Sequence, residues 1–395
     1  MVFFKSDATR RKGYVAYLLR LFLNMLHYMT ENYLINRLIV DRVNNDLGAS
    51  FTAISRKNNR IVKRARAEGE AKLRDEIEWI LRFKGTRLER YLPKIYSYSL
   101  EPGDVHYEMR YYDYPNLRRI VDVEINARFF VRLRLLHLFE LLEGELWIES
   151  NSSECPPDFV ENEYFRKFYE RRDAALAMDP YFAHFYDAPV LELNGKRLPN
   201  AAQLIEAIAS DPVALASLVP PRLYISHGDL HSNNILCGIG HSTMILIDCR
   251  GRSSGGLLYF DPAYDIAKLF HDFRGMYSLI ERHAFSIFHR IEAEPRIEYC
   301  LTDERMRAKF RRHYAFIRAV AHRRLTRFSN LLERADFAEA MLFLTMIPMH
   351  MRLRDEGLMC YVTGVAELNS YCSRYRPALY ASVCKKLGIE GESIR

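Results

Sequence analysis

The chain has 395 residues, 49% of them apolar and 27% charged, and its formal net charge is +7. This composition is typical of a soluble globular protein with one large domain or two lobes, and not of a disordered chain. The small positive excess suits an anionic ligand and gives no reason to expect a nucleic acid partner. Seven cysteines occur, an odd number without C-x-x-C spacing, so we expect reduced thiols in a cytoplasmic protein.

An amphipathic helix is predicted near the N-terminus, over residues 14–40. Polar residues recur there at helical spacing, at Arg20, Asn24, His27 and Glu31. The stripe interrupts the apolar run, which is therefore too polar to span a bilayer, and no small-residue cleavage site follows. We expect this extension, residues 1–44, to pack on the protein's own body; peripheral contact with a membrane through residues 14–40 is the alternative.

Residues 45–111 are predicted to form a small antiparallel sheet with one helix. Strand patterns occur at residues 47–55, 61–64, 93–99 and 105–111. Between the second and third of these, residues 68–83 have a helical pattern, in which Leu73, Ile77 and Ile80 share one face. The short segments Lys57–Arg60 and Glu101–Asp104 are typical of turns.

The rest of the chain, residues 112–395, is predicted to be mainly helical. Helical patterns occur near residues 124–143, 161–178 and 200–209, and further helices are expected from Asp248 to the end. One hairpin is predicted where Val190–Leu193 meets Asn194-Gly195. A sheet with one helix, followed by a helical region, indicates an α+β protein with two lobes and a cleft between them.

One stretch, HGDLHSNNIL at residues 227–236, has the residues that phosphoryl transfer requires. Asp229 can orient an acceptor hydroxyl and take its proton late in the reaction. Asn234, chosen over Asn233 because it is five residues after Asp229, offers an amide oxygen suited to Mg²⁺. Asp248 follows an apolar strand, Met244–Ile247, and is the second expected metal ligand. In isolation each would more often be a turn residue; their spacing favours the catalytic interpretation.

A lysine and a glutamate in the first lobe complete the expected phosphate site. Lys63 lies on a predicted strand, from which its ammonium can reach nucleotide phosphates, and a helix glutamate can hold it in place. Glu70, Glu76 and Glu78 compete for this role. We favour Glu76 because the apolar residues around it place it near the buried face of the helix.

These motifs resemble those of the aminoglycoside phosphotransferase and choline kinase family, which has a protein-kinase-like fold. The matching pieces are HGDLHSNNIL (227–236), LIDCRG (246–251) and DPAYDIAKL (261–269). The hairpin at Asn194-Gly195 and the stretch Ile347–His350 are also similar to phosphotransferases of capsule and surface-polysaccharide biosynthesis. The resemblance implies ATP and Mg²⁺ as cofactors, a small antiparallel N-lobe with one helix, and a larger helical C-lobe.

The resemblance also implies roles for further residues. His227 and Asp265 match residues that brace the catalytic loop, and Met109 and Tyr111 match the strand whose backbone bonds adenine. The full glycine pattern of a phosphate loop is missing, so backbone N–H groups with the hydroxyls of Ser50 or Thr52 must serve.

The acceptor is expected to be a small molecule or a glycan. Asp248 is followed by Cys-Arg-Gly rather than Phe-Gly, as in the small-molecule kinases that the chain resembles. Basic residues are dense over residues 305–334; they are expected to form a solvated helix face, and they count against a cationic aminoglycoside. The alternatives are an aminoglycoside- or choline-type kinase and a nucleotide-binding pseudokinase scaffold.

Overall fold

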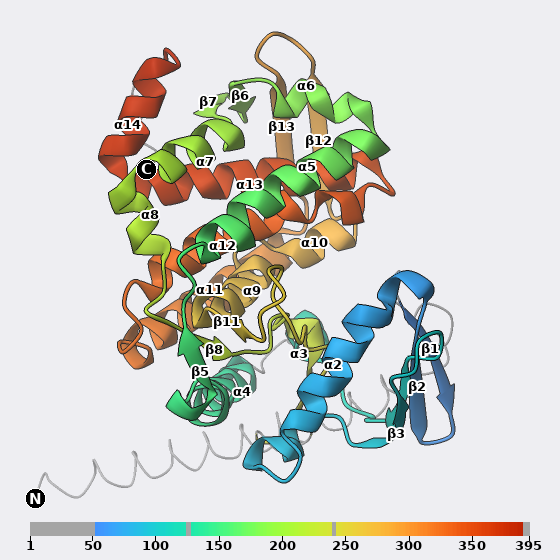
Figure 1. Cartoon of the computed structure of the whole chain (residues 1–395). Coiled ribbons are helices and arrows are strands. Elements are labelled where there is room, and N and C mark those ends of the chain that lie inside the picture. Colours follow the sequence, from blue (N-terminus) through green and yellow to red (C-terminus); the bar gives the residue numbers. More distant parts are fainter. Residues whose placement is uncertain (1–51, 124–127, 239–241, 390–395) are drawn as a thin grey trace, which may run out of the picture. The chain divides into compact units, whose positions relative to one another are not determined.

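The computed structural model describes residues 52–123, 128–238 and 242–389 (Figure 1). The predicted helix over residues 14–40 and Ser50 lie outside the described residues. Contacts divide the chain into two compact units. Unit 1 contains the residues up to 138 and residues 233–248, and unit 2 contains residues 139–232 and 249–395. The chain therefore passes between the units three times: after Leu138, after Ser232, which lies within the predicted catalytic stretch, and after Asp248.

Unit 1 contains a four-stranded antiparallel sheet with the order β1-β2-β4-β3. Its strands are β1 (Thr52–Lys57), β2 (Arg60–Ala65), β3 (Ile95–Ser99) and β4 (His106–Arg110). The two-residue turn between β1 and β2 is possible because Asn58 adopts a positive φ of 53°, which asparagine tolerates. Helix α2 (Glu70–Arg82) packs its apolar face on β4, as the periodicity predicts.

Unit 1 also contains further helical elements and a second, two-stranded sheet. They are η3 (Arg87–Tyr91), α3 (Leu117–Val123), most of α4 (Arg128–Leu141), β9 (Ile235–Cys237) and β10 (Met244–Leu246). Strands β9 and β10 pair antiparallel, with Leu246 opposite Ile235. Asn116 forms an isolated bridge with Leu236, so the chain after β4 runs next to β9.

Unit 2 is built around helices. The longer ones are α5 (Arg166–Met178), α7 (Ala201–Ser210), α9 (Pro262–Phe273), α11 (Glu304–Arg324), α12 (Leu331–Thr345), α13 (Arg354–Tyr375) and α14 (Pro377–Lys386). Shorter turns are η4 (Leu142–Leu146), η5 (Glu149–Asn151), η6 (Glu161–Phe165), η7 (Pro180–Phe182), α6 (Ala183–Tyr186), α8 (Pro212–Leu218), η8 (Ser232–Asn234, whose last two residues belong to unit 1), α10 (Tyr277–Glu281) and η9 (Ile347–His350). Helix α12 packs against both α9 and α13 and is buried almost throughout (Figure 1).

Two strands that the sequence did not predict interrupt the helices of unit 2 after α10. β12 (Phe285–Arg290) and β13 (Arg296–Leu301) form an antiparallel hairpin. β13 then pairs parallel with β6 (Val190–Leu193), which forms the predicted hairpin with β7 (Lys196–Pro199). The alternation of half-buried and exposed residues along β12 is typical of a strand. A second, three-stranded sheet has the order β11 (Tyr259–Phe260), β8 (Arg222–Ile225), β5 (Ser152–Glu154).

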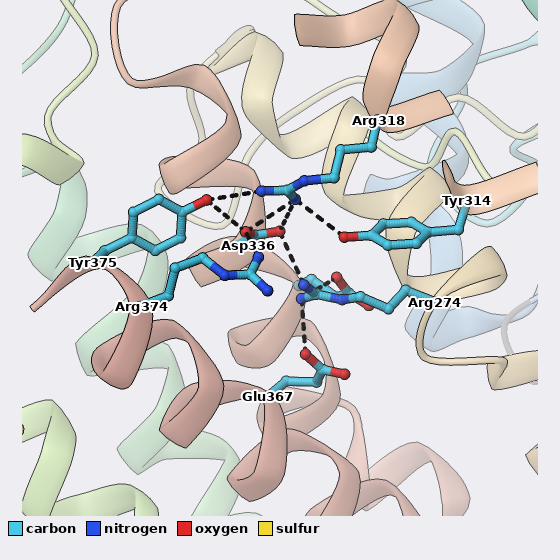
Figure 2. Close-up of polar contacts among 8 residues, drawn as sticks. Arg274, Tyr314, Arg318, Asp336, Glu367, Arg374 and Tyr375 are labelled. Carbon is cyan, nitrogen blue, oxygen red and sulfur yellow. Dashed lines mark hydrogen bonds and ion pairs between the residues drawn. The ribbon is translucent and has the colours of Figure 1, made fainter. Parts of the chain in front are cut away.

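Buried charges on α12 are neutralised by a network that joins four helices (Figure 2). Asp336 accepts hydrogen bonds from Arg274 at 3.0 Å, from Arg318 at 2.8 Å and from Tyr375 at 2.8 Å. Arg274 also pairs with Glu339 and Glu367, at 2.5 and 2.9 Å. Because isolated buried charges are costly, this network explains how an interior helix keeps two carboxylates.

The basic segment at residues 305–334 is only partly a solvated face. Arg318 belongs to the network just described, Arg324 donates to Glu143 at 2.7 Å, and Arg334 pairs with Asp261 at 2.6 Å. These arginines therefore stabilise unit 2. All seven cysteines are unpaired, and five of them are buried. Among the described residues, no single helix is long and apolar enough to cross a membrane; α7 and α8, bent by 96°, pass that test only as a pair.

Candidate active site

A buried lysine in unit 1 contacts two carboxylates. Lys63 lies on β2, and its Nζ donates to both oxygens of Glu76 on α2, at 3.0 and 2.7 Å. The same Nζ lies 2.5 Å from Oδ1 of Asp248. The ion pair expected between Lys63 and Glu76 is thus present, and Asp248, 185 residues away in sequence, joins it.

Burial and hydrogen bonding fix this arrangement. The side chains of Lys63 and Glu76 are only 9% and 7% exposed, whereas that of Asp248 is 44% exposed. Tyr107 on β4 donates its hydroxyl to Glu76 at 2.8 Å, so the glutamate is held from two elements. Burial lowers the pKa of Lys63, but Glu76 and Asp248 outweigh it, so the net pKa is raised and the ammonium stays charged. Asp248 is the exposed member of the cluster, so its carboxylate is accessible to a ligand.

The β9–β10 ladder places Asn234 and Asp248 at the same end of two paired strands. Asn234 immediately precedes β9, and Asp248 follows β10 by two residues. The N–H of Ile247 donates to the carbonyl of Asn234 at 3.0 Å, which extends the ladder to this point. Asp248 has a positive φ of 57°, so the chain turns sharply there. An amide oxygen and a carboxylate at one strand end are a donor pair that fits Mg²⁺.

This donor pair needs further ligands. Among the described residues, no group of three or more His, Cys, Asp or Glu side chains is arranged to hold a metal ion. Mg²⁺ commonly binds through one or two protein ligands together with substrate phosphates and water. The side chains of Asn234 and Asp248 therefore fit a metal that arrives with a phosphorylated ligand, rather than a closed structural site.

The remaining residues expected to bind the nucleotide are less informative. Thr52 is buried at the start of β1. Met109 is on β4, where it pairs with Ile61 of β2. The N–H of Tyr111 donates to the carbonyl of Asn59 at 3.0 Å, so that donor is already used within unit 1. Adenine recognition by Met109 and Tyr111 stays a prediction.

The loop with Asp229 lies in unit 2 and is braced by α9. Both carboxylate oxygens of Asp265 accept backbone N–H groups, from His227 at 3.0 Å and from Gly228 at 2.8 Å. The N–H of Asp229 in turn bonds Nδ1 of His227 at 3.2 Å. Gly228 has φ +75°, and an added Cβ would lie 2.8 Å from Cβ of Arg250. Glycine is therefore required immediately before Asp229.

Two basic residues that the sequence did not single out contact Asp229. Lys268 Nζ lies 2.8 Å from one oxygen of Asp229, and His231 Nε2 lies 3.6 Å from the other. Burial raises the pKa of Asp229, but the charges of Lys268 and His231 outweigh it and leave the pKa well below its ordinary value. The carboxylate is therefore held ionised and oriented, and its capacity as a strong base is reduced.

One face of α9 explains these contacts. Asp265, Lys268 and Asp272 are spaced i, i+3 and i+7, so they share that face. Asp265 holds the start of the loop, Lys268 reaches Asp229, and Asp272 accepts the N–H of Ser232 at 2.9 Å. This spacing from Asp265 was visible in the sequence and could have indicated that Lys268 and Asp272 also contact the loop.

The combination of a lysine–glutamate pair, a metal-type ligand pair and a braced aspartate is the arrangement of kinase-like phosphotransferases. The sequence profile of the Phosphotransferase enzyme family (APH) matches residues 44–300, and the chain belongs to this family. The matched region runs from the residues before β1 to β13, and membership implies a protein-kinase-like fold. A comparison with curated proteins returns no match.

Proposed function

We propose that the protein is an ATP- and Mg²⁺-dependent phosphotransferase that phosphorylates a hydroxyl of a small molecule, namely a sugar or polysaccharide precursor. The observation that carries the proposal is the contact of one buried ammonium, Lys63, with both Glu76 and Asp248. Burying the Lys63–Glu76 pair is costly if it serves stability alone. A phosphate-binding site benefits from it, because the lysine is held rigidly next to a carboxylate that remains accessible.

Each residue then has one task. Lys63 binds the nucleotide phosphates and Glu76 orients it, while Asn234 and Asp248 hold the metal. Bound Mg²⁺ would neutralise negative charge on the phosphates. Asp229 accepts a hydrogen bond from the acceptor hydroxyl and thereby directs the hydroxyl oxygen toward the phosphorus atom that it attacks. A weak, ionised base is sufficient, because the transition state of phosphoryl transfer is loose and the proton leaves late.

The proposal includes an architecture: the lysine unit and the Asp229 unit act as the two lobes of a kinase, with the acceptor bound on the second. Two of the three places where the chain crosses between them, residues 232–233 and 248–249, adjoin the expected metal ligands. A polysaccharide precursor as acceptor is supported by the resemblance of the Asn194-Gly195 hairpin and of Ile347–His350 to phosphotransferases of capsule and surface-polysaccharide biosynthesis.

The central test is Asp229→Ala, assayed by ATP consumption with a library of hydroxylated metabolites and glycan precursors. We expect turnover to fall by about 10²–10⁴-fold, with nucleotide affinity retained, because the residue orients only the acceptor. Glu101→Gln, which alters an exposed carboxylate in unit 1, is the control and should behave as wild type. Undiminished phosphorylation by Asp229→Ala would remove this residue from the mechanism.

Asp248→Asn tests the metal site. The amide preserves the shape of the side chain and removes its charge, so we expect ATP to bind more weakly and to require more Mg²⁺. Calorimetric titration of ATP at several Mg²⁺ concentrations measures this. An unchanged dependence on Mg²⁺ would assign the metal to other ligands.

A further inference from the structure

Three basic side chains from three segments of unit 2 converge on one buried phenol, Tyr264. Arg250 donates to the Tyr264 hydroxyl at 2.6 Å, and the Nζ of Lys167 on α5 lies 5.9 Å from the ring centre. Lys268 is one helical turn along α9 from Tyr264. Burial raises the pKa of Tyr264, but the charges of Arg250, Lys167 and Lys268 outweigh it and lower the pKa. The phenol thus lies in a strongly positive environment.

Lys167 has too few partners for a buried lysine. The residue is 8% exposed, yet within the described part of the chain its ammonium has no hydrogen bond. Its one ionic neighbour, Glu163, is 3.6 Å away, and the other oxygen of that glutamate accepts the N–H of Ser254 at 2.8 Å. Burial lowers the pKa of Lys167, which means that keeping its ammonium charged inside the protein costs free energy. An ammonium has three donors, and a buried one is normally paired.

This positive cluster extends to the proposed catalytic carboxylate. Lys268 contacts Asp229 at 2.8 Å. Three cations, Lys167, Arg250 and Lys268, face the carboxylates of Glu163, Asp229 and Asp265. Burial raises the pKa of Asp265 to about 7, so its negative charge is only partial at neutral pH and the cluster keeps a positive excess. His231, 3.6 Å from Asp229, adds a further positive charge whenever it is protonated. An acceptor whose hydroxyl reaches Asp229 would bring its other substituents near these cations.

We propose that Lys167, Arg250 and Lys268 form an anion-binding subsite for the acceptor, which is therefore a hydroxylated compound that carries a phosphate or a carboxylate group. The inference rests on the proposed function and narrows it to phosphorylated or acidic sugars. What distinguishes this subsite from a structural cluster is that the Lys167 ammonium makes no hydrogen bond within the described residues and has its carboxylate neighbour at 3.6 Å. In the balanced network around Asp336, by contrast, the arginines are matched by carboxylates (Figure 2).

The test compares a neutral hexose, its 6-phosphate and the matching hexuronic acid as acceptors and as ligands. Wild type should prefer at least one anionic compound by about 10- to 100-fold in kcat/KM, the effect of one or two hydrogen bonds to a charged group. Lys167→Met removes the charge at similar volume and should lose most of that preference through KM. Lys385→Met, an exposed lysine of α14, is the matched control and should change neither value.

Stability separates a ligand-binding lysine from a structural one. Lys167→Met also removes the ion-pair partner of Glu163, which is 2% exposed, so it is compared with the charge-neutral double variant Lys167→Met/Glu163→Gln. If Lys167 is kept for a ligand, the double variant should keep a melting temperature close to that of wild type and still lose the preference for anions. A lower melting temperature with an unchanged preference for anions would overturn the inference. If Lys167→Met does not fold, Arg250→Gln tests the same subsite by the same comparison of acceptors.

Calorimetry without nucleotide separates failure of the subsite from failure of the proposed function. Binding of the hexose 6-phosphate or the hexuronic acid that Lys167→Met abolishes would support the subsite even if no acceptor is phosphorylated, and shows which anion it takes. Efficient phosphorylation of the neutral hexose, with neither anionic compound bound, would overturn the subsite and leave the phosphotransferase intact.

Discussion

The buried pair Lys63–Glu76 allows stability and catalysis to be separated by a double-mutant cycle. The two side chains share hydrogen bonds of 3.0 and 2.7 Å and are less than one tenth exposed. Removing one member of a buried ion pair leaves the other charge uncompensated and costs about 3–5 kcal/mol. Replacing both with neutral groups of similar size is often close to neutral. We therefore expect Lys63→Met and Glu76→Gln each to destabilise, and the double variant to recover most of the loss.

The cost of Lys63→Met should also depend on pH. Burial is the largest influence on the pKa of Glu76 and raises it, while Lys63 opposes that effect. Without the lysine, the folded-state pKa lies above the unfolded value, so the protonated glutamic acid is favoured in the folded protein. Such a group stabilises fully below the unfolded pKa, and the stabilisation is lost as the pH rises through the folded pKa. Lys63→Met should therefore be close to wild type at acid pH and least stable at alkaline pH.

Urea unfolding at several pH values measures these free energies, and ATP consumption measures the activity. All three variants should be inactive, because the double variant restores the packing and not the ammonium. The pair Arg60–Glu108 is the control: it joins the same sheet, but its side chains are 51% and 26% exposed. Its cycle should give a coupling energy of about 0–1 kcal/mol. Equal coupling energies for the two pairs, or an active double variant, would refute the reasoning.

Three further predictions concern unit 2. Asp336→Ala should cost about 3–5 kcal/mol in urea unfolding because it breaks a buried network, whereas Arg374→Ala, with a side chain 50% exposed, should cost about 0–1 kcal/mol. Gly228→Ala should destabilise by about 1–3 kcal/mol more than Gly256→Ala, because both have positive φ but only the first would clash; equal losses would contradict this. Lys268→Met should move the acid limb of the kcat–pH profile to higher pH, because Lys268 lowers the pKa of Asp229 and its removal lets that pKa rise.

Local patterns predicted the strands and the helix of the sheet in unit 1, because each of these elements has its own short-range periodicity. The apolar residues around Glu76 on α2 were sufficient to select it among three glutamates, and in the structure it accepts a hydrogen bond from Lys63. The contact of Lys63 with Asp248 depends on how β10 lies relative to β2, which no local pattern contains. The sequence therefore indicated the residues of the candidate site and not this contact between them.

In unit 2 the sequence was least informative where pairing is non-local. β13 pairs with β6, which is about 100 residues earlier, and nothing in either strand specifies the other. The dense arginines of α11 were visible, but the sequence did not show that Arg318 and Arg324 contact carboxylates on other elements. Lys167 could not be distinguished from any surface lysine, because its burial results from packing of the whole unit.

The dependence of the loop on α9 implies that stability and catalysis are coupled in unit 2. Asp265 and Lys268 fix the position of Asp229 only as accurately as α9 itself is fixed. Asp261 is the N-cap of α9 and the partner of buried Arg334 on α12, and Arg274, the C-cap, donates to Asp336. Both ends of the helix are thus tied to α12 by buried ion pairs. Substitutions that loosen either tie should displace Asp229 and lower kcat before they unfold the protein, because misplacement of a reacting group by about 1 Å already costs about 10²-fold in rate.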